Sequence, residues 1–172
     1  LDLDHFKRVN DQLGHDAGDQ VLRQFADFLR AMVHPRDEVL RWGGEEFLLV
    51  LQPLPEQHLA GLAERLVRSI EQHAFTLEDG RSVALTASLG LCPYPLAAPH
   101  APTGHWELAI ELADKGLYTI KHGTRNGWCL VLPRATEAVL REHIDSSLDA
   151  LQAKGLIDVE RAPPEQTDLS ET

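Results

Sequence analysis

The stretch Arg41-Trp42-Gly43-Gly44-Glu45-Glu46-Phe47 joins two short apolar runs, residues 38–42 and 45–51. Two adjacent glycines between such runs predict a β-hairpin, because tight hairpin turns need residues that adopt positive φ angles. A backbone without Cβ atoms also lets a phosphate or a sugar lie against the chain. The pattern alone leaves both interpretations open, since the glycines can simply make the turn.

The spacing of apolar residues predicts regular elements on both sides of this hairpin. Before it, Leu1-Asp2-Leu3 is typical of the end of a buried strand, and helices are predicted over residues 6–11 and 17–33, the second with Asp16 as its N-cap. After it we expect a helix over 56–73, strands at 75–77 and 82–83 around a turn, a strand over 84–91, a loop over 93–104, a helix over 105–122 and a closing strand over 128–132. This order predicts an α+β fold with a central mixed, largely antiparallel sheet flanked by helices, its first strand truncated.

The C-terminal segment changes character at about residue 160. An amphipathic helix is predicted over residues 135–154, followed by Gly155 as a helix stop. The remaining residues are polar and include Pro163-Pro164, which is typical of disorder. We therefore expect one domain over residues 1–132, a helical extension over 133–159 and a disordered tail over 160–172.

Composition bounds the function classes of this 172-residue chain. Its net charge of -11 argues against a nucleic-acid partner, which needs clustered Lys and Arg. No apolar run reaches the ~18 residues of a membrane span, so we expect no membrane contact by this segment. Two cysteines and no recognisable signal peptide favour the cytoplasm. The chain begins at Leu1 and its one methionine is Met32, so we expect further sequence upstream.

Asp2 and Glu45 are acids at the ends of two predicted strands. If these strands are neighbours in the sheet, both carboxylates can hold one hard cation, and Mg²⁺ typically takes one or two carboxylates plus substrate phosphates. The alternative is that both acids are solvated, and spacing along the chain alone favours that alternative.

Polar residues elsewhere leave similar alternatives open. Asn10 and Asp19 belong to an acidic cluster that can be a solvated helix start, whereas a buried Asp there could accept the N1–H and N2–H of guanine, a donor pair that adenine lacks. Lys121 and Arg125, at the end of the helix predicted over 105–122 and just past it, can simply complement the helix dipole.

Taken together, five motifs resemble those of the diguanylate cyclase (GGDEF) domain family over residues 1 to about 132. Residues 41–47 resemble the family signature in its GGEEF variant, with Glu45 where Asp is usual. The other matches are D-x-D-x-F-K-x-x-N-D at residues 2–11, G-H-x-x-G-D at 14–19, T-x-S-x-G at 86–90, and a late block containing Ala113-Asp114, Tyr118, Lys121, Gly123, Arg125 and Asn126.

The resemblance implies a role for each matched residue. Asp2, Glu45 and the Leu3 carbonyl would bind Mg²⁺ or Mn²⁺, and Glu46 would help to organise the catalytic site around Glu45. The expected substrate-binding residues are Asn10 and Asp19 for guanine, Gly43 and Gly44 for the ribose and α-phosphate, and Lys121 and Arg125 with the Phe6-Lys7 loop for the β- and γ-phosphates.

The implied activity is the condensation of two GTP into cyclic di-GMP, a bacterial second messenger, with release of two pyrophosphates. One site holds one GTP, so two domains must face each other as a homodimer. A sensory or receiver domain is expected upstream. Two other interpretations stay open: a catalytically silent module that binds GTP or cyclic di-GMP, and a fragment that is inactive because it does not dimerise.

One departure from the family concerns product inhibition. Many members carry an R-x-x-D inhibitory site ahead of the signature, and the aligned residues here are His34-Pro35-Arg36-Asp37. A neutral imidazole lacks the donor fork with which Arg holds guanine and phosphate. We therefore predict a degenerate site at His34, Asp37 and Arg65 with weak or absent inhibition, although Arg36 and Arg65 could partly compensate.

Overall fold

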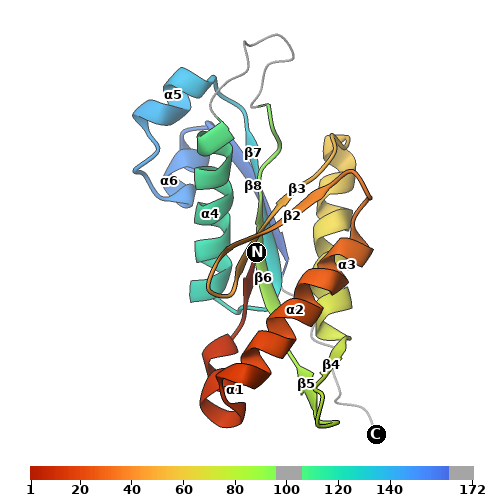
Figure 1. Cartoon of the computed structure of the whole chain (residues 1–172). Coiled ribbons are helices and arrows are strands. Elements are labelled where there is room, and N and C mark those ends of the chain that lie inside the picture. Colours follow the sequence, from red (N-terminus) through yellow and green to blue (C-terminus); the bar gives the residue numbers. More distant parts are fainter. Residues whose placement is uncertain (96–105, 163–172) are drawn as a thin grey trace, which may run out of the picture. The chain divides into compact units, whose positions relative to one another are not determined.

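The short strand β1 (Asp2–Leu3) lies between two other strands of a sheet (Figure 1). The structure is a computed structural model that describes residues 1–95 and 106–162, and the chain divides into two units, Leu1–Ser88 and Leu89–Thr172. Strand β1 pairs antiparallel with β3 (Glu46–Val50) on one side and with β6 (Ala87–Leu91) on the other. Asp2 consequently lies opposite both Glu46 and Ser88.

The hairpin predicted around the two glycines is confirmed. Strand β2 (Glu38–Gly43) pairs antiparallel with β3, and the register shifts between Arg41 and Gly43. Gly44 has a φ of 47°, in the left-handed region that favours glycine. The turn therefore accounts for Gly44, and the register shift shows where the ladder becomes irregular.

Helices α1 (Phe6–Leu13) and α2 (His15–Met32) connect β1 to the hairpin. The expectation that Asp16 caps the second helix is wrong, because the helix begins at His15 and Gly14 occupies the N-cap. Asp16 lies in the first turn, where its charge complements the helix dipole. The helix predicted over 56–73 is a 3₁₀ turn, η1 (Glu56–His58), followed by α3 (Leu59–Glu71).

An aromatic cluster forms part of the core of the first unit. The Phe25 ring of α2 packs edge-on against Phe47 of β3 with centroids 5.1 Å apart, and it lies 5.8 Å from Phe75. Phe75 belongs to β4 (Ala74–Thr76), which pairs antiparallel with β5 (Ser82–Ala84) as expected from the turn between them. Such ring pairs stabilise by about 0.5–1.5 kcal/mol beyond their buried area.

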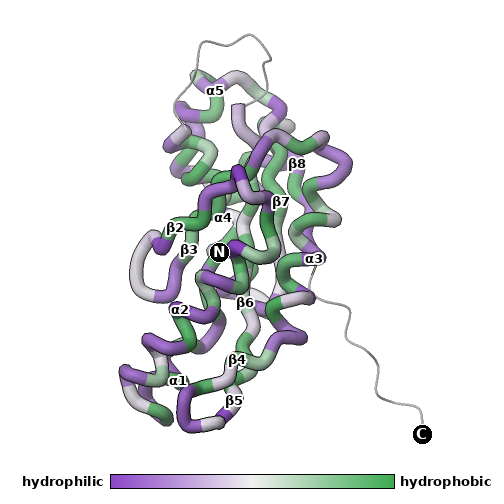
Figure 2. Tube along the Cα trace, turned by 45° about the vertical axis from the view of Figure 1, so that its right-hand side comes forward, coloured by the Kyte–Doolittle hydropathy of each residue, from purple (hydrophilic) through white to green (hydrophobic). Residues whose placement is uncertain are grey.

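The second unit is built around β7 (Gly127–Pro133), which is buried along its whole length. Helix α4 (Trp106–His122) packs on β7, and the apolar colouring of that strand is visible in Figure 2. The predicted loop over 93–104 includes residues 96–104, which lie outside the described part of the chain. Close packing leaves no room for a side chain at Gly90, where a Cβ atom would lie 1.9 Å from the Ala113 carbonyl oxygen.

The expected single helix over residues 135–154 is wrong. The structure has two short helices, α5 (Glu137–Glu142) and α6 (Leu148–Ala153), because Ser147 caps a new helix by accepting the Ala150 N–H at 3.2 Å. After Gly155, with a φ of 67°, the chain returns as β8 (Ile157–Ala162).

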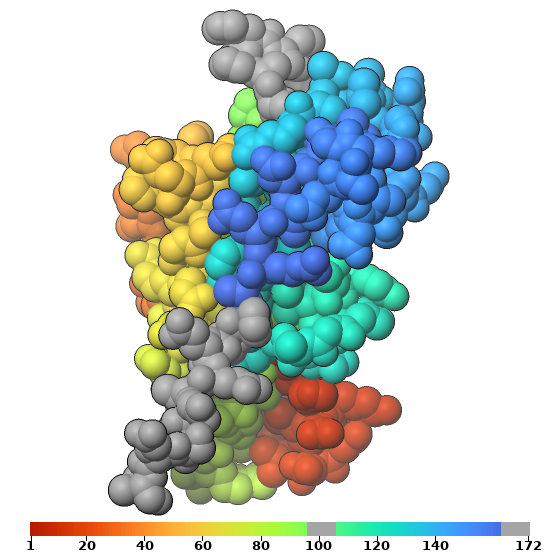
Figure 3. Space-filling view, turned by 180° about the vertical axis from the view of Figure 1, so that it is seen from behind, coloured from red at the N-terminus to blue at the C-terminus, as the bar shows by residue number. Residues whose placement is uncertain are grey.

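Strand β8 pairs antiparallel with β7, so β7 does not close the sheet as expected. The helical extension to residue 159 and the disorder from residue 160 are likewise wrong over 157–162, while residues 163–172 lie outside the described part. In Figure 3 the segment from α5 to β8, in blue, forms one continuous surface. Buried Leu140, Leu151 and Ile157 join it to the core of the second unit. The proposed domain end near residue 132 stays a prediction.

No helix within residues 1–95 and 106–162 combines the length and the apolar character that a bilayer crossing requires.

Candidate active site

The pairing of β1 with β3 brings the predicted metal-binding residues to adjacent strands. The Leu3 N–H donates to the Glu45 carbonyl oxygen at 3.3 Å, and the Phe47 N–H donates to the Leu1 carbonyl oxygen at 2.8 Å. Asp2 and Glu45 are both partly buried, whereas Glu46 is exposed. The condition on which the metal prediction depended, that these two strands are neighbours, is therefore met.

The register adds a detail that the sequence did not show. Asp2 pairs directly with Glu46, and Glu45 precedes the ladder in the turn. Both acids of the signature thus lie beside β1. Sequence spacing alone could not distinguish them, because the register shift in the hairpin decides which acid enters the ladder.

This group suits a hard divalent cation such as Mg²⁺ or Mn²⁺ better than a softer metal such as Zn²⁺. Among the described residues no three His, Cys, Asp or Glu side chains gather as a preformed metal cage. A pair of carboxylates with a backbone carbonyl supplies only oxygen donors, and Mg²⁺ completes such a set with water and substrate phosphates. Asp2, Glu45 and the Leu3 carbonyl would hold the ion.

The two residues expected to bind guanine lie together where α1 meets α2. A Cβ atom at Gly18 would lie 1.9 Å from Asn10 Oδ1, so the Asn10 side chain rests on the bare backbone of α2 next to Asp19. Gly18 had been given no role from the sequence. The sequence feature that could have pointed to Gly18 is its place in the G-H-x-x-G-D motif, one residue before Asp19.

Phe6 and Lys7 form the first turn of α1 rather than a loop. The Phe6 side chain is buried in the core, and its ring tip lies 3.2 Å from the position of a Cβ atom at Gly18. Its side chain is thus unavailable to a ligand, and only its main chain can serve the expected phosphate-binding role. Backbone N–H groups in a first helical turn have no partner within the helix and suit anions.

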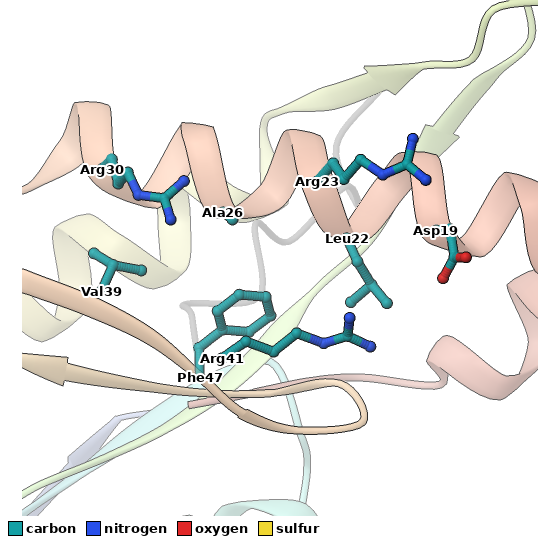
Figure 4. A pocket seen from close by; sticks show the side chains of 8 residues that line it. All are labelled: Asp19, Leu22, Arg23, Ala26, Arg30, Val39, Arg41 and Phe47. Atoms are coloured by element: carbon teal, nitrogen blue, oxygen red, sulfur yellow. The ribbon is translucent and has the colours of Figure 1, made fainter.

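A cavity of about 300 Å³ lies between α2 and the β2–β3 hairpin. Figure 4 shows Asp19, Leu22 and Arg41 directed into the space between them. The lining residues are Asp19, Leu22, Arg23, Ala26, Arg30, Val39, Arg41 and Phe47. Three of these residues are arginines, two from α2 and one from β2, on a chain whose net charge is -11. Such a group of cations suits a phosphorylated ligand.

Arg41 is a site residue to which sequence reasoning assigned no role. Its Nε donates to the Gly44 carbonyl oxygen at 2.9 Å, so its guanidinium braces the turn that carries the two glycines. Gly43 itself has open surroundings, since the nearest atom to a Cβ there would be Glu46 Oε2 at 3.9 Å. No atom of the described residues blocks this position, so the predicted approach of the ribose and the α-phosphate to the Gly43 backbone stays possible.

The expected phosphate-binding cations belong to the second unit. Lys121 is in the last turn of α4, and the Arg125 N–H donates to the Ile120 carbonyl oxygen at 3.0 Å. Arg125 and Asn126 have φ angles of 54° and 43°, a left-handed conformation that is strained for side chains other than glycine. The two units are not placed relative to one another, so the grouping of these cations with Gly43 and Gly44 stays a prediction.

The three residues of the predicted inhibitory site line one groove of about 390 Å³, together with Arg36. Asp37 already accepts two backbone hydrogen bonds, from the His34 N–H and the Gln52 N–H, both at 2.7 Å. His34 Nδ1 accepts the Arg36 N–H at 3.2 Å. The Asp37 carboxylate therefore supports the turn before β2, and the inhibitory role of this groove stays a prediction.

Residues 1–127 match the family model described as "Diguanylate cyclase, GGDEF domain". The chain belongs to the GGDEF domain family. A curated relative, diguanylate cyclase DosC of Shigella sonnei, is 34% identical over 128 residues, which cover 73% of this chain and 26% of DosC. The chain spans about a quarter to a third of the length of DosC and of diguanylate cyclase A of Treponema denticola.

Solved GGDEF domains have the same fold. The GGDEF domain of PA1120 (YfiN or TpbB) from Pseudomonas aeruginosa aligns with a TM-score of 0.64 at 34% identity, covering 75% of this chain and 77% of that one. The active GGEEF domain of a diguanylate cyclase from Vibrio cholerae aligns with a TM-score of 0.60 at 30% identity, covering 75% and 78%. The predicted α+β fold and the predicted relationship to diguanylate cyclases are confirmed.

Proposed function

We propose that this GGDEF domain condenses two molecules of GTP into cyclic di-GMP and releases two pyrophosphates. The observation that carries the proposal is the β1–β3 pairing, which joins the D-x-D and Gly-Gly-Glu-Glu motifs through the Leu3–Glu45 hydrogen bond. The active GGEEF domain of the Vibrio cholerae diguanylate cyclase, a solved relative, supports a functional role for glutamate at position 45.

The first step is selection of the base. The Asp19 carboxylate accepts the N1–H and N2–H of guanine, and the Asn10 amide supplies a further polar contact beside it. Adenine presents neither donor at these positions, so ATP would leave the carboxylate unpaired at a cost of several kcal/mol. Gly18 permits this arrangement because it leaves space for the Asn10 side chain.

The second step is placement of the phosphates. The Gly43 and Gly44 backbone lies against the ribose and the α-phosphate, and Arg41 holds that turn through the Gly44 carbonyl. The first turn of α1, with Lys121 and Arg125, binds the β- and γ-phosphates. Asp2, Glu45 and the Leu3 carbonyl would hold Mg²⁺ or Mn²⁺, and such an ion would supply Lewis-acid chemistry for the attack of the 3′-hydroxyl on the α-phosphate. Glu46, which lies opposite Asp2 in the ladder, would help to organise the catalytic site.

The reaction requires two copies of the domain. Each site holds one GTP, and the product contains two guanylates, so the 3′-hydroxyl of each GTP attacks the α-phosphate of the other in a homodimer. Regulation then follows from dimerisation, which an upstream sensory or receiver domain in the cytoplasm would control. Product inhibition is weak, because His34 replaces the expected arginine and Asp37 is occupied by backbone donors.

The test is product analysis after incubation with GTP and Mg²⁺ over a range of protein concentrations. Cyclic di-GMP whose yield per chain rises with protein concentration supports a dimeric cyclase. GTP binding without product at high concentration would instead support the silent binding module. A rate per chain that rises once the chains are joined by a dimerising fusion would identify the inactive-fragment interpretation.

A further inference from the structure

Asp4 is a buried carboxylate that the proposed mechanism leaves without a role. It follows Leu3 directly and is 2% exposed. Its Oδ1 accepts the Ser88 hydroxyl and its Oδ2 accepts the Thr86 hydroxyl, each at 2.8 Å. Its N–H also donates to the Thr86 carbonyl oxygen at 2.8 Å. The second acid of D-x-D therefore meets the two hydroxyl residues of the T-x-S-x-G motif.

Burying a carboxylate costs free energy, so a residue that only filled space here would more simply be apolar. Both Asp4 oxygens are engaged by hydroxyl donors within the protein, which makes Asp4 unsuited to be a metal ligand itself. Its contacts instead join the chain just after β1 to Thr86, the residue before β6, and to Ser88 within β6. Each carboxylate oxygen of Asp4 thus has its own hydroxyl donor, and the two hydrogen bonds together fix the orientation of the side chain.

The position of Asp4 in the chain decides which groups its hydrogen bonds to Thr86 and Ser88 can position. On its N-terminal side are Leu3 and Asp2, whose carbonyl and carboxylate would hold the proposed metal. On its C-terminal side is His5, with a φ of 56°, which turns the chain sharply into α1. A shift at Asp4 would therefore move the metal ligands of β1 and the first turn of α1 at the same time.

We propose that Asp4, held by Thr86 and Ser88, is a positioning residue that orients Asp2 and the Leu3 carbonyl toward the divalent metal. The inference rests on the proposed function, because it concerns the same metal site. Residues that do not touch the metal but hold its ligands in position typically contribute about 10- to 100-fold to metal affinity. The same role gives the T-x-S-x-G motif a physical reason for its two hydroxyl groups.

The test measures Mn²⁺ affinity in the presence of saturating 3′-deoxyGTP, which lacks the attacking hydroxyl and cannot react. Asp4→Asn and Thr86→Val are compared with Thr86→Ser, which keeps the hydroxyl, and with Asp79→Asn, an exposed acid in the same unit that is paired with Arg81. Mn²⁺ affinity is read by electron paramagnetic resonance, and the melting temperature of each variant is recorded alongside.

We expect Asp4→Asn and Thr86→Val to weaken Mn²⁺ binding about 10-fold or more, with Thr86→Ser and Asp79→Asn near the parent value. Unchanged affinity in Asp4→Asn overturns the proposal. If Asp4→Asn does not fold, Thr86→Val and Ser88→Ala decide the question in the same way. Asp2→Asn and Glu45→Gln distinguish failure of the proposed metal site from failure of the positioning role. If neither variant weakens Mn²⁺ binding, the proposed metal site itself is wrong. If both weaken it and Asp4→Asn does not, only the positioning role is rejected.

Discussion

The main-chain N–H of Leu3 donates a hydrogen bond to the carbonyl oxygen of Glu45 at 3.3 Å. This single contact joins residues 42 positions apart in the chain and brings the turn of the signature to the end of β1. Asp2 and Glu45 are consequently close along adjacent strands, and the first prediction concerns which acids the proposed site uses.

Replacing Glu45 with Gln should lower cyclic di-GMP formation by about 100-fold or more, because charge stabilisation through a bound metal is worth several kcal/mol. Glu46→Gln should have a smaller effect, since Glu46 pairs with Asp2 without being the proposed ligand. Glu38→Gln, at the far end of the same hairpin, is the matched control. A larger loss of cyclic di-GMP formation in Glu46→Gln than in Glu45→Gln would indicate that Glu46, and not Glu45, is the metal ligand.

Gly43→Ala should leave the free energy of unfolding nearly unchanged, because a Cβ there meets no atom closer than 3.9 Å. It should nevertheless weaken GTP binding, since the methyl group occupies the space proposed for the ribose and α-phosphate. Gly44→Ala, at a φ of 47°, should instead destabilise the fold by about 1 kcal/mol. Denaturant unfolding with GTP titration distinguishes the two, and unimpaired GTP binding in Gly43→Ala would contradict the proposed contact.

Gly18→Ala should impair guanine recognition, because its Cβ would fall 1.9 Å from Asn10 Oδ1 and force that side chain to move. The expected result is a raised KM for GTP and reduced preference for GTP over ATP. Gly61→Ala is the control within a helix: nothing lies within 4 Å, so it should stabilise α3 by up to about 1 kcal/mol. Unchanged base preference in Gly18→Ala would place the guanine elsewhere.

His34→Arg should restore a product-binding site in the groove shared with Asp37 and Arg65. The parent is expected to bind cyclic di-GMP there more weakly than ~10 µM, about 7 kcal/mol, and the variant at least about 10-fold more tightly. Calorimetric titration with Arg65→Ala as a second variant localises the binding. Tight binding by the parent that is lost on mutating Asp37 would show that the site is intact without the arginine.

Burial raises the pKa of the Cys92 thiol to about 12 and that of Cys129 to about 11. Both thiols should therefore react slowly with iodoacetamide at pH 8 in the folded protein and rapidly after unfolding. Because an unfolded thiol loses its proton nearer pH 9, this contribution to stability is constant below about pH 8 and falls as the pH rises toward 11. Rapid labelling of the native protein at pH 8 would contradict the raised pKa of these thiols.

Local patterns were sufficient for much of the fold. The hairpin around Gly43-Gly44, the strands on both sides of the turn before Ser82, and the helix that became α4 all follow from apolar periodicity and turn chemistry, which act between near neighbours in the chain. The C-terminal segment was mispredicted because amphipathic spacing cannot show that Ser147 starts a new helix or that β7 offers an open edge to β8.

The sequence by itself determined the family, the hairpin and the identity of the polar residues available for chemistry, since motifs and turns depend on residues close in the chain. Only the tertiary structure decided that Asp2 faces Glu46, that Asn10 rests on Gly18, that Arg41 braces Gly44, and that Asp4 meets Thr86 and Ser88. These relationships depend on strand register and helix packing, which many distant contacts set together and no short stretch of sequence encodes.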